Sequence, residues 1–110
     1  MEYQKHKDIT AEDNAKWEAQ YGKSRISDLD IEVDGKTYKF IVRKPDRNVL
    51  KAIGRHAAQK DVEKVNEVLI KNCVLGGDME ALEKDGEVYL EVLDSVNLLK
   101  SKAKKTLKKR

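Results

Sequence analysis

The stretch LDIEVDGKTYKFIVRKP, residues 29–45, decides the fold, because its pattern predicts a two-stranded antiparallel hairpin. Before the turn, aliphatic residues alternate with acidic ones, as they do in a strand that buries one face. The dipeptide Asp34-Gly35 favours a two-residue type I′ turn, in which both central residues adopt a positive φ. The sequence therefore predicts that the two strands meet at this dipeptide.

A turn at that position also predicts the register, because a slip by one residue would move every side chain to the opposite face. The expected pairs are Val33 with Lys36, Ile31 with Tyr38, Leu29 with Phe40, and Asp30 with Lys39. In this register apolar residues meet on one face and opposite charges meet on the other. Ile41 is the exception, because it falls on the polar face, and we expect it to pack under an N-terminal helix or a partner.

Two helices are expected after the hairpin, within residues 46–73. Pro45 ends the strand and suits the first turn of a helix, because it has no N–H group to leave unpaired. The residues expected to point inward from the first helix are Val49, Leu50, Ile53 and Ala57. Gly54 weakens this helix, which suggests that another backbone approaches it closely.

The second helix is expected to begin at Asp61, a candidate N-cap, and to end at Gly76-Gly77. Its apolar stripe consists of Val62, Val65, Leu69 and Cys73. Asp78 is then expected to cap a short helix.

A last helix is expected from about Glu87, and the residues on its apolar face are Tyr89, Val92, Val96, Leu99 and Ala103. Residues 88–90 could instead begin a strand. A helix is favoured, because the three-four spacing persists for about four turns.

Residues 1–27 are expected to form a polar leader that contains one short helix. Its first residues are expected to fray. A helix over residues 10–21 has a thin apolar face, so it either docks through Trp17 and Tyr21 or remains a mobile arm that orders on a partner. Residues 23–27 are expected to be a linker.

These elements predict an α+β fold, with an N-terminal β-hairpin packed on a small bundle of about four helices and an additional N-terminal helix. A two-stranded hairpin is only marginally stable alone, so its apolar face must lie on the helices that follow. With 110 residues the chain can form one modest core, and residues 28–100 are assigned to a single domain.

Charge is distributed unevenly along the chain, although the formal net charge is only +3. The end of the chain, including the basic tail over residues 101–110, holds seven basic residues and no acidic ones: Lys100, Lys102, Lys104, Lys105, Lys108, Lys109 and Arg110. Of the 23 basic residues, 16 remain outside this group against 20 acidic ones, so the rest of the chain carries −4. The tail is either a solvated helix end or an electrostatic binding segment.

No pattern in the sequence points to catalysis, a metal or a cofactor. His6 and His56 lack Cys, His or carboxylate neighbours at metal-ligand spacing. Cys73 lies in an apolar helical stripe, which is typical of a core residue in a reducing cytoplasm. No apolar run is long enough to span a bilayer. We therefore expect a cytoplasmic, non-enzymatic protein without a membrane anchor.

The segment DGKTYKFIVRKP, a helix, a break at Lys60-Asp61 and then VNEVLIKNCVLGGD resemble the tail assembly chaperones of long-tailed bacteriophages and related prophages. In that family a short β-hairpin precedes a helical bundle. The resemblance covers roughly residues 28–100 and rests on element order and a loose pattern. It does not extend to residues 10–21.

The resemblance implies a protein that binds the long, helical tape measure protein, keeps it soluble and helps tail tube subunits to assemble around it. Many family members also have a longer, frameshifted form, and A-rich slippery codons could encode Lys104-Lys105 and Lys108-Lys109 here. The candidate client-binding residues are Ile41, Ile53, Leu69 and Tyr89.

Two other functions remain open. The tail could bind nucleic acid by neutralising phosphates, in which case binding weakens with salt and is lost when residues 100–110 are deleted. The tail has no aromatic residue for base stacking and only one arginine, so specific recognition is not indicated. The protein could also be a structural component that self-associates through the edge of the hairpin.

Overall fold

The computed structural model describes residues 2–99 and 106–110, and these form an α+β fold, as the sequence predicts. The described part contains five α-helices and one three-stranded antiparallel sheet. The helices are α1 (Ala11–Tyr21), α2 (Arg47–Ala58), α3 (Val62–Cys73), α4 (Met79–Lys84) and α5 (Gly86–Leu99). The strands are β1 (Ile26–Val33), β2 (Lys36–Arg43) and β3 (Val74–Gly77), and 3₁₀ turns cover His6–Asp8 and Lys23–Arg25.

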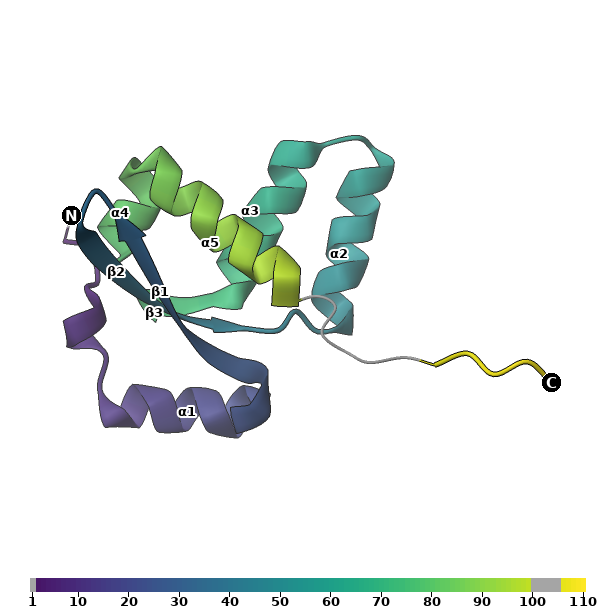
Figure 1. The fold of residues 1–110 in the computed structure, drawn as a ribbon, viewed down its shortest axis with the longest axis horizontal. Coiled ribbons are helices and arrows are strands. Elements are labelled where there is room, and N and C mark those ends of the chain that lie inside the picture. Colours follow the sequence, from purple (N-terminus) through teal and green to yellow (C-terminus); the bar gives the residue numbers. More distant parts are fainter. Residues whose placement is uncertain (1, 100–105) are drawn as a thin grey trace.

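The sheet separates α1 from the other four helices (Figure 1). On one side α5 packs against β1 and β2, and α3 and α4 pack against α5. Helix α2 packs chiefly on α3, and this pair extends beyond the sheet. We call the side of the sheet that faces α5 the inner face and the opposite side, where α1 lies, the outer face. The predicted hairpin on a bundle of four helices, with an additional N-terminal helix, is confirmed.

The hairpin has the predicted register throughout. Val33 pairs with Lys36, Ile31 with Tyr38, Asp30 with Lys39 and Leu29 with Phe40. At the turn, Asp34 has φ 53° and Gly35 has φ 78°, so both central residues adopt the positive φ that a type I′ turn requires. Local turn chemistry and alternation were therefore sufficient to define this unit.

The third strand was not predicted. Helix α3 ends at Cys73 rather than at the two glycines, and Val74–Gly77 forms β3 along the free edge of β2. Gly77 has φ 142°, and a Cβ there would lie 2.7 Å from the Cα atom of Phe40. The glycines thus allow a close approach of two backbones, and β2 becomes the central strand of the sheet.

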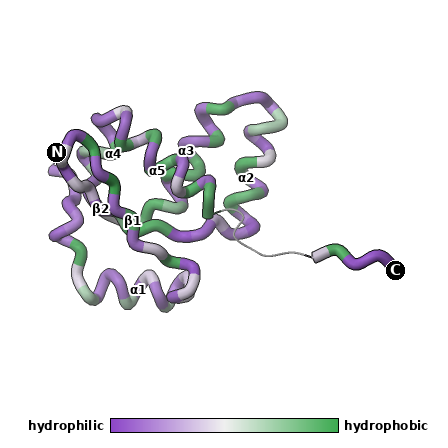
Figure 2. Tube along the Cα trace, in the orientation of Figure 1, coloured by the Kyte–Doolittle hydropathy of each residue, from purple (hydrophilic) through white to green (hydrophobic). Residues whose placement is uncertain are grey.

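The main core lies between the inner face of the sheet and helices α3 and α5. Its fully buried side chains are Phe40, Val42, Leu69, Cys73, Val88, Val92 and Val96. The three valines lie on one stripe of α5 because they are four residues apart. Figure 2 shows hydrophobic segments alternating with hydrophilic ones along the hairpin and the helices. The prediction that residues 88–90 are helical is confirmed.

Three residues predicted to point inward are exposed instead. Leu50 and Ala57 lie on the uncovered side of α2, because this helix packs chiefly on α3 and buries only Val49 and Ile53. Val62 is 68% exposed, at the start of α3 and far from the sheet (Figure 1). The predicted close approach at Gly54 is also wrong, since a Cβ there would have no atom within 4 Å.

The start of the chain is more ordered than predicted. The residues at 23–27 are not a linker, because strand β1 already begins at Ile26, which pairs with Arg43. Residues 2–9 do not fray as predicted, since the backbone carbonyl of Gln4 accepts a hydrogen bond from the N–H of Met79 at 3.1 Å. At the other end α5 is described as far as Leu99, and Ala103, predicted on its apolar face, lies outside the described residues.

Substitution of Gly54 by alanine should stabilise the protein by about 1 kcal/mol, because Gly54 is in an exposed helix interior with room for a Cβ. Urea unfolding of the wild type and the variant measures the difference. The matched control is Gly77→Ala, where the positive φ and the contact with Phe40 predict destabilisation. A Gly54→Ala variant that is less stable than the wild type would contradict this assignment.

Asp46 is the N-cap of α2, and Pro45 precedes the cap rather than opening the helix. A hydrogen bond from the N–H of Val49 holds the pKa of Asp46 below its ordinary value, and the nearby Arg43 guanidinium acts in the same direction. A depressed pKa in the folded state stabilises the protein above about pH 4 and stops doing so as the pH falls further.

Asp46→Ala should therefore cost about 1 kcal/mol near neutral pH, and Asp46→Asn, which keeps a capping oxygen, should cost less. Urea unfolding at a series of pH values measures both. The difference between wild type and Asp46→Asn should shrink below pH 4, and a constant difference would show that the charge of Asp46 contributes nothing.

Candidate functional site

The four candidate client-binding residues lie in three different environments. Ile53 is 8% exposed and Leu69 is fully buried, and both belong to the main core. Ile41 is 3% exposed but lies on the outer face, outside that core cluster. Tyr89 is half-buried and lines an open apolar groove. In the folded chain, only Tyr89 of these four is in a position to contact a partner directly.

This apolar groove has a volume of about 430 Å³ and is formed by the end of α3, helix α4, the start of α5 and the N-terminal segment. Its lining residues are Tyr3, Ile70, Met79, Leu82, Glu83 and Tyr89. A hydrogen bond to Glu83 raises the pKa of the Tyr3 hydroxyl above its ordinary value. Aliphatic and aromatic walls with one carboxylate suit an apolar side chain rather than a reaction.

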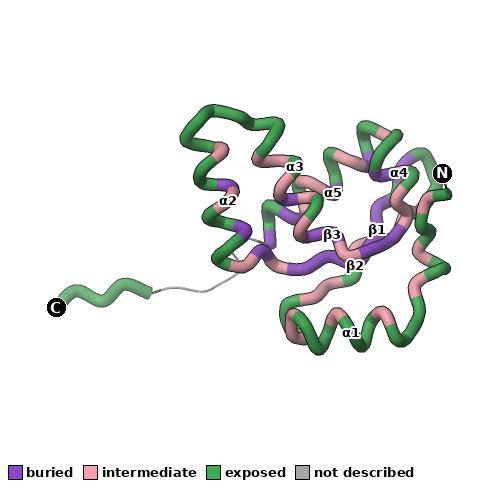
Figure 3. Tube along the Cα trace, turned by 180° about the vertical axis from the view of Figure 1, so that it is seen from behind, coloured by how far each residue is buried: buried purple, intermediate pink, exposed green. Residues whose placement is uncertain are grey.

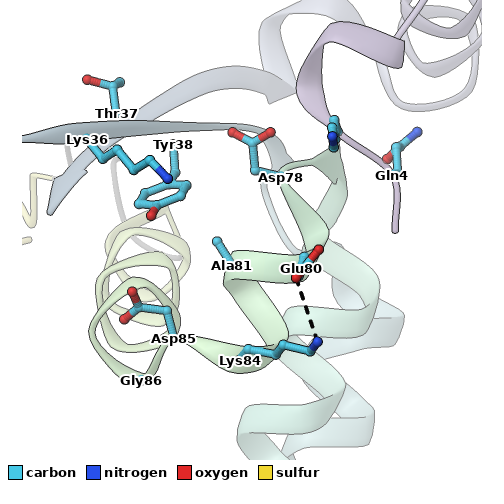
Figure 4. Close-up of a pocket in the computed structure, with 11 residues that line it drawn as sticks. Gln4, Lys36, Thr37, Tyr38, Asp78, Glu80, Ala81, Lys84, Asp85 and Gly86 are labelled. Atoms are coloured by element: carbon cyan, nitrogen blue, oxygen red, sulfur yellow. Dashed lines mark ion pairs between the residues drawn. The ribbon is translucent and has the colours of Figure 1, made fainter. Parts of the chain in front are cut away.

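A larger cavity, of about 690 Å³, lies between β2 and the corner where α4 meets α5 (Figure 4). The charged side chains contributed by α4 and its two ends already have partners. Glu80 pairs with Lys84 at 3.7 Å, and the Asp85 carboxylate accepts hydrogen bonds from the N–H groups of Glu87 and Val88. No group of His, Cys, Asp or Glu in the described residues could hold a metal ion.

Asp78, at the edge of this larger cavity, connects three segments. It was predicted to cap α4, but its side chain makes no capping hydrogen bond. Its carboxylate instead accepts hydrogen bonds of 2.9 Å from the N–H groups of His6 and Lys39. The prediction failed because two unpaired amides from distant segments compete for the same oxygens.

The outer face of the sheet is covered by the N-terminal strap, which we define as residues 4–21. Gly76 lies under the strap, because a Cβ at Gly76 would lie 3.1 Å from the Cη2 atom of Trp17 and 3.2 Å from the Cδ1 atom of Ile9. Ile41 is the sheet neighbour of Gly76. The strap therefore explains why Ile41 is buried, and of the two predicted covers for Ile41 the N-terminal helix is the one observed.

Arg43 is the one buried charged residue in the described part of the chain, and it anchors the end of the strap. Its Nε atom donates a hydrogen bond of 2.8 Å to the carbonyl oxygen of Asn72, and its Nη1 atom is 3.3 Å from Asp46. The guanidinium also lies 4.3 Å from the ring centre of Tyr21. These contacts satisfy a charge that would be costly to bury alone.

The basic tail is only partly described. Lys108, Lys109 and Arg110 are exposed. The other predicted tail residues, Lys100, Lys102, Lys104 and Lys105, lie outside the described residues.

Comparisons with protein families, curated proteins and solved structures found no match to this chain. Among the helices of the described residues, none has the combined length and apolar character that crossing a membrane requires.

Asp78→Ala should destabilise the protein by about 1–3 kcal/mol, because two backbone amides, one of them partly buried, lose their charged acceptor. The matched control is Glu80→Ala, two residues away, which removes only an exposed ion pair and should change stability by less than about 1 kcal/mol. Urea unfolding compares the two variants. Equal effects would mean that Asp78 does not hold the strap and β2 together.

Proposed function

We propose that this protein is a non-enzymatic tail assembly chaperone of a long-tailed bacteriophage or prophage. It binds helical segments of the tape measure protein in the host cytoplasm and assists the assembly of tail tube subunits around them. The resemblance over residues 28–100 supports this function, as does the hairpin-then-bundle order that the fold shares with the family.

The observation that carries the proposal is the apolar groove beside Tyr89. It is open to solvent and lined almost entirely by apolar side chains. An amphipathic helix places one apolar side chain per turn along a stripe, and such side chains fit grooves between helices. The groove therefore suits one anchor residue of a helical client.

The rest of the surface supports the same role. Charged residues make up 39% of the chain, and the described helices expose mainly polar side chains around the groove. A charged exterior keeps a complex soluble while a local apolar surface binds the client. No covalent step is needed for this function.

The test is co-expression of the chain with the product of the neighbouring tape measure gene. The wild type should keep that product soluble, and Tyr89→Ala should weaken the complex about tenfold, as the loss of an aromatic anchor does. The matched control is Leu98→Ala on the same helix, because Leu98 is 71% exposed and lies outside the groove.

Urea unfolding of both variants confirms that they remain folded. An insoluble tape measure protein in the presence of the wild type would refute the proposed function. Equal binding by wild type and Tyr89→Ala would refute the role of the groove.

A further inference from the structure

The outer face of the sheet carries an apolar surface that the main core does not use. Ile41 projects from β2 on this side, and its sheet neighbour Gly76 leaves a flat area beside it. The other outer-face positions on β1 are Ile26, which is half-buried, and Asp28, Asp30 and Glu32, which are exposed. Lys39 of β2 lies opposite Asp30 on the same face, so three carboxylates and one lysine surround the apolar positions. An apolar patch with a charged margin is a typical feature of a binding surface.

Gly76 shows that this patch is shaped for close packing. Its φ lies outside the left-handed region, so the backbone does not require glycine there. What excludes a side chain is the strap, whose Gln4, Ile9 and Trp17 atoms would lie 2.9–3.2 Å from a Cβ. The absence of a side chain at Gly76 thus leaves room for the segment that packs on the outer face. We call this space, beside Ile41 and over Gly76, the seat, and in the free chain the strap occupies it.

Within the strap, helix α1 is held less firmly than residues 4–9, because its contacts with the sheet come from Trp17 over Gly76 and from Tyr21 beside Arg43. None of the residues of α1 is buried, and Figure 3 shows only exposed and intermediate positions along this helix. Trp17 and Tyr21 are half-buried, and the main polar contacts come earlier, from Gln4 and His6 to the region of β3 and α4. A segment held in this way opens at a much lower free energy than the core does.

Charge also favours replacement of the strap. Helix α1 carries Glu12, Asp13 and Glu18 against one lysine, and it lies on the side of the sheet where the β1 carboxylates project. Two acidic surfaces repel each other. A helix that presents a large apolar residue flanked by lysine or arginine would fit the same seat and interact favourably with the carboxylates.

We propose that the outer face around Ile41 and Gly76 is a second binding surface, for a basic amphipathic helix of the partner, and that the N-terminal strap occupies it in the free protein. This inference rests on the proposed function for the identity of the partner. The strap then acts as an internal competitor, so the apparent affinity for the partner is reduced by the fraction of chains in which the seat is occupied.

The experiment is hydrogen exchange, measured by mass spectrometry on the full chain, free and in complex with the co-expressed tape measure protein. In the free protein the amides of α1 should exchange faster than those of α5, because the strap opens without global unfolding. In the complex, exchange in α1 should become faster still, while residues 39–42 and 74–77 remain protected. Slower or unchanged exchange in α1 on complex formation overturns the proposal.

Two variants test the competition directly. Trp17→Ala weakens the strap and leaves the seat intact, so it should bind the tape measure protein about tenfold more tightly than the wild type. Gly76→Val also expels the strap but fills the seat, so it should show no such gain. Gln20→Ala, a change at an exposed and uncharged position on the same helix, is the control and should bind as the wild type does.

The outcomes separate the two proposals. A complex that forms equally well with wild type and Trp17→Ala overturns the competition and leaves the proposed function standing. The absence of a complex with the wild type, Trp17→Ala and Gln20→Ala alike overturns the proposed function together with the partner inferred here.

Discussion

The second half of the central strand β2 is buried on both faces, and the rest of the structure depends on this constraint. Four successive residues, Phe40, Ile41, Val42 and Arg43, are all at least 95% buried. In a hairpin that lies on a helical bundle only alternate residues need cover, because the other face meets water. Here the inner face meets α5, the outer face meets the strap, and β1 and β3 pair with the two edges.

Arg43 shows how this burial joins distant segments. Its side chain contacts the carbonyl of Asn72 at the end of α3, the N-cap Asp46 of α2 and the ring of Tyr21 at the end of α1. A buried guanidinium requires several partners, since an unpaired charge is expensive to desolvate. One residue of β2 therefore positions three helices around the end of the sheet.

The sequence predicts those parts of the fold that depend on neighbours along the chain. The turn at Asp34-Gly35, the hairpin register and the apolar stripe of α5 follow from local patterns, and all are present. Strand β3 could not be predicted in this way, because a segment of four residues with two glycines has little strand preference of its own. It becomes a strand because β2 offers unpaired backbone groups at that edge.

The candidate site was harder to predict for a related reason. Periodicity identifies apolar residues but not what covers them, so Leu69 in the core and Tyr89 beside the groove look alike in the sequence. Ile41 was different, since an aliphatic residue on a polar face breaks the alternation. That break was the one sequence signal for the outer face, whereas nothing local indicated that Gly76 would form its seat.

The N-terminal segment contacts both candidate surfaces, each through different residues. Tyr3 lines the apolar groove and is hydrogen-bonded to Glu83 of α4, while Ile9 and Trp17 pack over Gly76 on the outer face. The intervening residues are tied to the structure at Asp78. Because the hydrogen bond to Asp78 lies between the two contacts, Trp17 can leave the outer face while Tyr3 stays beside Glu83 in the groove.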